Sequence, residues 1–239
     1  MKIIDKSGKR LDGKAEEKAY KKRAKEEDPI IRTVEKDDEL SEYSPMDPPE
    51  AYDETYTKAT LGYDEMNKGI QVLMDEHKKA IEQIEKFEAA LLELKTSGYR
   101  MTREINDALS VFFQYFDNNI LEHNRKEEKY LFQLLHDKMI ESGESSKEAI
   151  PQTAVDLMED DHVKFIQLAG LTFNLLGLAV RLPDENSRAL TFDVAFNSGH
   201  ELIELLKLHI FREDNTLFPI AQQLISTDEF AQFEDKLAG

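Results

Sequence analysis

The chain has 239 residues, of which 40% are hydrophobic, and this is enough for one medium-sized domain with a packed core and a tail. Its formal net charge of -18 disfavours nucleic acid as a partner, because phosphate binding requires a basic face. The absence of cysteine excludes disulfides, thiolate catalysis and cysteine-ligated clusters, and leaves nitrogen and oxygen ligands for any metal.

Residues 1–60 are predicted to form a charged, proline-containing N-terminal arm without a sustained apolar period. A basic patch over residues 18–25 precedes an acidic run over residues 35–39. This composition favours an arm that is partly disordered or packed on the acidic body, and a dimerisation or protein-docking element is the alternative. The N-terminus lacks the apolar core of a signal peptide, and no apolar run reaches the roughly 18 residues of a membrane span. We therefore expect a cytoplasmic protein with no membrane partner.

Helical periodicity begins near residue 63, with apolar residues at steps of three and four. The inner stripe of the first helix comprises Ile70, Leu73, His77, Ile81, Ile84, Phe87, Leu91 and Leu94. Gly98 supplies a C-terminal stop signal. A second helix is predicted from Thr102 to Glu141. Its inner face comprises Ile105, Leu109, Phe112, Phe116, Ile120, His123, Glu127, Leu131 and Leu134.

A third helix is predicted with Pro151 in its first turn and its end near Pro183. Its inner side comprises Val155, Met158, His162, Phe165, Ala169, Phe173 and Leu176. Asp184 or Ser187 is expected to cap a fourth helix, in which Pro219 introduces a kink. The stripe of this helix comprises Phe192, Phe196, Leu202, Leu206, His209, Glu213, Leu217 and Ile220. Residues 227–237 read as a short packing helix. With no strand pattern, residues 61–239 are predicted to be an all-α, antiparallel up-down four-helix bundle.

Each predicted helix places one histidine in its apolar stripe, and two of the helices add a glutamate one turn later. The six residues are His77, His123, Glu127, His162, His209 and Glu213. A lone histidine on an apolar face is usually a hydrogen-bonded core residue. Two buried carboxylates without partners, however, would cost several kcal/mol each. Because no stripe position offers lysine or arginine, the sequence predicts metal ions as their counter-charge.

Residues out of phase with these stripes provide an internal comparison. His136 and His200 are predicted at the surface. Acidic residues next to the six in the chain are rotated by about 100° around the helix axis. We therefore expect them to face solvent or a neighbouring helix: Glu76, Glu122, Glu128 and Asp161.

Six ligands of this kind fit two metal ions, each with two terminal imidazoles and with both glutamates as bridges. Nitrogen and carboxylate ligands suit iron, with manganese or zinc as less favoured ions. An oxo or hydroxo bridge would leave an open position for a small gaseous ligand. The expected apolar neighbours suit such a ligand better than a charged metabolite: Leu73, Met74, Phe112, Phe116, Met158, Phe165 and Leu206.

With these residues in place, the sequence resembles the hemerythrin-like (HHE cation-binding) family over residues 65–225. The resemblance implies a four-helix bundle with a non-haem di-iron centre. His77 and His123 would bind one iron, and His162 and His209 the other. Oxygen-carrying hemerythrins have a further histidine where this chain has Met158. They also space their last carboxylate one residue further.

The set of four histidines and two glutamates is more similar to the di-iron domain of repair of iron centres (RIC) proteins. That resemblance implies a link to nitrosative stress and iron–sulfur repair, although such proteins commonly carry an N-terminal module with cysteines. The favoured hypothesis is a di-iron protein that binds or reacts with dioxygen, nitric oxide or peroxide in stress response, sensing or iron handling. The alternatives are RIC-like cluster repair or nitric oxide reduction, and a metal-free structural bundle that binds a partner protein.

Overall fold

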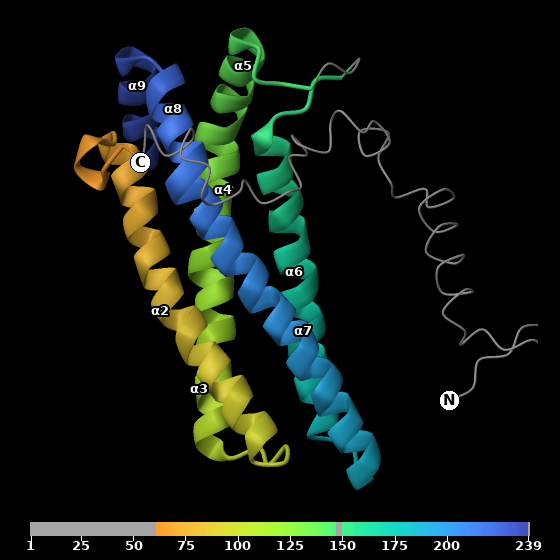
Figure 1. Cartoon of the computed structure of the whole chain (residues 1–239). Coiled ribbons are helices and arrows are strands. Elements are labelled where there is room, and N and C mark those ends of the chain that lie inside the picture. The colour runs from red at the N-terminus through yellow and green to blue at the C-terminus, as the bar shows by residue number, and fades with distance from the viewer. Residues whose placement is uncertain (1–60, 147–149, 239) are drawn as a thin grey trace, which may run out of the picture. The chain divides into compact units, whose positions relative to one another are not determined.

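The computed structural model describes residues 61–146 and 150–238. The predicted N-terminal arm, residues 1–60, lies outside this part. Within the described part the regular structure is helical, and no strand is present. Four long helices alternate in direction along the bundle (Figure 1). The predicted all-α antiparallel bundle is confirmed.

The first long helix is a single element, and the second is built from five consecutive segments. A short 3₁₀ helix, η3 (Tyr63–Glu65), precedes α2 (Lys68–Thr96). The second long helix comprises α3 (Arg103–Tyr115), η4 (Phe116–Ile120), α4 (Leu121–Glu127), η5 (Glu128–Phe132) and α5 (Gln133–Ser142). Segments η4 and η5 are π-helical, so each accommodates one extra residue in the helix.

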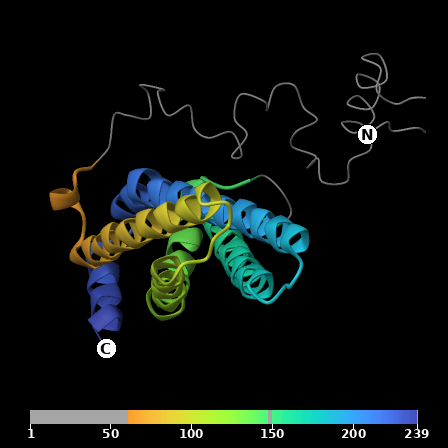
Figure 2. The same cartoon turned by 90° about the horizontal axis from the view of Figure 1, so that it is seen from below.

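The third long helix is continuous, and the fourth again contains a π-helical segment. The third is α6 (Ala154–Ala179), and the fourth comprises α7 (Glu185–Arg212), η6 (Glu213–Leu217) and α8 (Phe218–Leu224). The predicted packing helix is confirmed as α9 (Thr227–Ala238), which packs against α2. Figure 2 shows α9 beside the beginning of α2.

Most helix ends follow the expected signals. Gly98 adopts a left-handed φ of 70° after α2, and the Ser187 N–H donates to the Asp184 carboxylate at the start of α7. The prediction for Pro151 was wrong, because this residue precedes α6. Thr153 caps that helix instead, and its own backbone N–H donates to Asp156. A side-chain cap satisfies the free N–H groups of the first turn, which proline cannot do.

The core consists of two hydrophobic clusters that meet at the same level on every long helix. On α2, Leu73 belongs to one cluster and Ile84 to the other, with His77 between them. On α6, Met158 and Phe165 flank His162 in the same way. The buried polar residues therefore form a layer between two apolar halves of the bundle.

At two levels of the bundle, a neighbouring residue is more deeply buried than the predicted core residue. Phe173 is 58% exposed, and the preceding residue, Thr172, is buried and donates a hydrogen bond to Ser198. At this level α6 and α7 approach closely at Gly199, where even an added Cβ would lie 3.2 Å from Thr172. A phenylalanine has no room there. Similarly, Leu135 is buried in place of Leu134, because the π-helical segment η5 shifts the inner face by one residue.

Candidate metal centre

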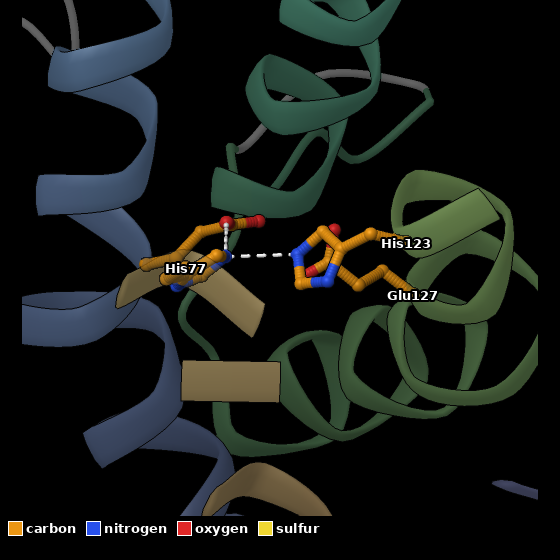
Figure 3. Close-up of side chains that lie close together, drawn as sticks. His77, His123 and Glu127 are labelled. Atoms are coloured by element: carbon orange, nitrogen blue, oxygen red, sulfur yellow. Dashed lines mark hydrogen bonds and ion pairs between the residues drawn. The ribbon is translucent and has the colours of Figure 1, made fainter. Parts of the chain in front are cut away.

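Six side chains from the four long helices converge in the polar layer between the two apolar clusters. All are buried: His77, His123, Glu127, His162, His209 and Glu213. Both glutamates have 0% exposure. Figure 3 shows that His77 and His123 point toward each other from different helices. The structure therefore brings together all six residues singled out from the sequence.

The six side chains form two adjacent groups of four that share both glutamates. The first group is His77, His123, Glu127 and Glu213, and the second is Glu127, His162, His209 and Glu213. In each group the potential ligand atoms lie within 4.8 Å of one another. Glutamates common to two such groups are positioned to bridge two cations.

Distances within the groups agree with this division. The Nε2 atoms of His77 and His123 are 2.8 Å apart, and those of His162 and His209 are 3.2 Å apart. Glu213 lies 3.2 Å from both His77 and His209, so it reaches one histidine of each group. Glu127 lies 3.2 Å from His123 and 3.7 Å from His162. Each carboxylate therefore faces both groups.

The chemistry of the donor atoms fits two cations. Nδ1 of His77 and of His123 each faces a carboxylate, which can only accept, so both Nδ1 atoms carry a proton and the Nε2 lone pairs point inward. Two Nε2 lone pairs at 2.8 Å repel unless protons or a metal ion lie near them. When two imidazoles bind one metal ion with bonds of about 2.1 Å and a nitrogen–metal–nitrogen angle of about 90°, their nitrogens lie about 3 Å apart.

The glutamate oxygens point to the same conclusion. Within the described residues, neither oxygen of Glu127 or Glu213 accepts a well-formed hydrogen bond. Burying such groups unpaired is costly, and a metal ion is an effective way to satisfy them. The donor set is thus that of a dinuclear metal site.

An outer carboxylate faces Nδ1 of every one of the four histidines. Each pair joins two helices: Asp214 and His77 at 2.8 Å, Glu76 and His123 at 2.8 Å, Glu128 and His162 at 2.7 Å, and Asp161 and His209 at 3.6 Å. We call these four acidic residues the outer carboxylates. Such contacts fix the tautomer and the orientation of a ligating imidazole.

The outer carboxylates form a closed ring around the centre. Each follows or precedes an inner residue in the chain, but faces a histidine of a different helix. The contacts run from α2 to the second long helix, then to α6, then to the fourth helix, and back to α2. Three of the four were expected to face solvent or a neighbouring helix, and they turn to the neighbour. Asp214 was missed, although it follows Glu213 as Glu128 follows Glu127.

Three further polar residues considered in the sequence lie outside the ring. Glu122, also next to an inner histidine, instead pairs with Arg125 on the exposed side of its helix. His200 is exposed as predicted. His136 was predicted at the surface but is half-buried, because its Nδ1 contacts the Thr153 hydroxyl at the beginning of α6.

The inner carboxylates and the outer ring control the protonation of the histidines. Burial alone lowers the pKa of His77, but the hydrogen bond to Asp214 and the nearby negative charge of Glu213 outweigh it and raise the pKa to about 10. The pKa of His123 and of His209 is likewise raised to about 9 against burial, mainly by the inner glutamates. Without metal, protons supply the positive charge that the site requires.

Two further shifts show how unequal the environments are. Burial lowers the pKa of His162, and the attraction of Glu127 only partly offsets this effect. Burial raises the pKa of Glu213, but the nearby His209 and His77 lower it well below its ordinary value. Glu213 therefore stays ionised, as a metal ligand must be.

Metal-free protein is expected to lose stability as the pH rises from 6.5 to 10. The folded-state pKa values of His77, His123 and His209 exceed the ordinary 6.5. Their stabilising contribution is therefore complete below pH 6.5 and is lost as the pH passes through 9 to 10. His162 has the opposite shift, which costs stability only toward acidic pH. We expect the free energy of unfolding to fall by several kcal/mol over this range.

Denaturant titrations of the metal-free protein at several pH values measure this loss. Glu213→Gln removes a carboxylate that raises the pKa of two of these histidines, so it should flatten the pH dependence. Stability that increases between pH 6.5 and 10 would contradict the expectation.

Fold and site together define a class of protein: a four-helix bundle that gathers buried histidines and glutamates around two adjacent cation-binding groups. The comparison with protein families agrees. The family described as Hemerythrin HHE cation binding domain matches residues 68–221, a range that includes all six side chains. The chain belongs to this family. No curated protein and no solved structure matched it.

Among the described helices, none is long and apolar enough to cross a membrane.

Proposed function

We propose that this protein binds two iron ions and that the loaded centre binds or reacts with dioxygen, nitric oxide or peroxide. Stress response, sensing and iron handling are the roles that such a centre would serve. The observation that carries the proposal is that the two four-residue groups share both Glu127 and Glu213. Nitrogen and carboxylate donors without thiolates favour iron, with manganese or zinc as less favoured ions.

The chain's own residues have distinct tasks in this proposal. His77 and His123 would hold one ion, His162 and His209 the other, and the glutamates would bridge them. Bound iron would supply redox chemistry and open coordination positions for a small ligand. The outer carboxylates hold the Nδ1 protons and keep the Nε2 atoms directed inward. The apolar clusters pack on both sides of the layer.

Cluster repair or nitric oxide reduction, as in RIC proteins, is a second candidate favoured by one observation. Met158 lies one turn before His162 and is buried in an apolar cluster. A thioether at this position replaces the additional histidine expected of an oxygen carrier. The centre therefore has a symmetric set of two histidines for each ion. A metal-free structural bundle is disfavoured, because it would leave the oxygens of Glu127 and Glu213 buried without a well-formed hydrogen bond in the described residues.

Metal analysis of the purified chain tests the proposal. After reconstitution with ferrous iron in air, we expect two iron ions per chain and an absorption band in the near ultraviolet from an oxo bridge. Parallel loading with manganese and zinc establishes the preference. A colourless chain with less than one metal ion after reconstitution would refute the proposal.

A further inference from the structure

A cavity of about 150 Å³ extends from the protein surface to the candidate centre. Its inner end is lined by His77, His123 and His209. Its walls are largely apolar and come from all four long helices: Ala80, Ile84, Ile120, Phe165, Leu206 and Ile210. Exposed Lys79, Asn118 and Asn119 lie at the mouth. A small molecule can therefore reach the centre from this side.

The cavity meets the two groups of ligands unequally. Both histidines of the first group line it, but of the second group only His209 does. His162 is instead covered by aromatic rings, since Phe132 stacks on it and Phe165 lies beside it. Of the seven apolar neighbours expected from the sequence, Phe165 and Leu206 are in the lining. A ligand that enters through the cavity would approach the ion held by His77 and His123.

One polar side chain deep in this lining lacks a partner. Asn124 is only 6% exposed, and its amide nitrogen makes no hydrogen bond within the described residues. Leaving a buried donor unpaired costs about 1 to 3 kcal/mol. Asn118, in contrast, lies near the mouth and donates to the Gln114 carbonyl. Asn124 is therefore a donor without a partner, within the described residues, in a largely apolar lining.

We propose that this cavity is the binding site for the external ligand and that Asn124 donates a hydrogen bond to that ligand. The inference rests on the proposed function. It adds the route by which the ligand enters, the ion that the ligand approaches and the kind of ligand that the site selects. A cavity of this volume has room for about five water-sized groups. The ligand is thus a small molecule within that size, with a hydrogen-bond acceptor at its free end.

Asn124→Leu tests this assignment, because leucine has a similar size but no donor. The probe is azide, a three-atom anion with a terminal acceptor nitrogen, titrated into the iron-loaded full chain and followed by absorption. We expect two iron ions per chain, as in the unmodified protein, and azide binding weakened about 5- to 10-fold. Asn174→Leu, at an exposed position of α6 outside the cavity lining, is the matched control and should leave azide affinity unchanged.

A second variant tests the cavity independently of Asn124. Ala80 is buried in the wall, so Ala80→Leu should narrow the passage and slow azide binding at least several-fold while the iron content stays the same. Unchanged azide affinity in iron-loaded Asn124→Leu would overturn the role of Asn124. Unchanged binding rates in Ala80→Leu would overturn the route. Neither result would touch the proposed function, which fails only if the unmodified chain binds no iron.

Discussion

Replacing both Glu127 and Glu213 by glutamine is expected to abolish binding of the ion pair and to make thermal unfolding insensitive to iron. Each glutamate faces one histidine of both groups, so their loss removes every bridging ligand. A bound metal stabilises the native state by about 2.7 kcal/mol when its concentration is a hundred times the dissociation constant. The double variant should lose that increment entirely. Metal analysis and unfolding curves with and without iron measure both effects.

Without metal, the same double variant should lose much of the pH dependence of stability expected for the parent chain. The inner glutamates help to keep the buried histidines protonated, and glutamine cannot do so. Glu122→Gln is the matched control, because Glu122 also adjoins a histidine but pairs with Arg125 at the surface. A double variant that retained two ions would contradict a metal centre.

Much of this layer could be predicted from the sequence, because burial follows helical periodicity. His77 lies between Leu73 and Ile84 in a regular stripe, and a stripe position faces the core irrespective of its chemistry. The carboxylates of Glu127 and Glu213 then made a cation necessary, since no basic residue shares their stripes. Burial and charge balance were therefore sufficient to identify the inner set.

The π-helical segments could not be predicted in this way. Segment η5 begins directly after the inner glutamate Glu127, and segment η6 begins at the other inner glutamate, Glu213. An extra residue per turn depends on how the helix packs against its neighbours, and π segments are frequent at functional sites for this reason. The consequence is visible at Leu135, which takes the core position predicted for Leu134.

Helical periodicity could not predict the contacts between helices either. The sequence placed Glu76 and Asp161 about 100° from the inner face, but it did not show which histidine each would reach. That choice depends on the order of helices around the bundle, which creates the closed ring. Asn124 was missed for a different reason: a single asparagine in a helix carries no signal, and only its burial without a partner reveals it.

The ring also reveals an internal symmetry of the centre. His77 and Glu76 on α2 correspond to His162 and Asp161 on α6, and Glu128 corresponds to Asp214. The two halves of the bundle therefore contribute equivalent sets of residues to the two groups of potential ligands. They differ in access, because the cavity leads to the half that contains His77. Equivalent ligands with unequal access would allow one ion to react while the other remains shielded.

Asp214→Asn is expected to weaken metal binding about 10- to 100-fold at the position held by His77 and His123. Asp214 accepts the Nδ1–H of His77 at 2.8 Å, so the uncharged amide would relax the orientation of that imidazole and reduce its basicity. Glu128→Gln removes the equivalent contact to His162 and should weaken the other position instead. Competition with a chromophoric chelator, read as two separate binding steps, measures the affinities.

The symmetry makes this pair of variants a mutual control. Asp75→Asn provides a third comparison, because Asp75 contacts Tyr63 and Lys78 at the protein surface and should leave both affinities unchanged. If Asp214→Asn and Glu128→Gln weakened the same binding step, the two ions would not be divided between the two histidine pairs as we propose. If neither affected affinity, the outer carboxylates would serve the fold alone. If each variant weakened a different binding step, the result would establish one ion for each half of the bundle.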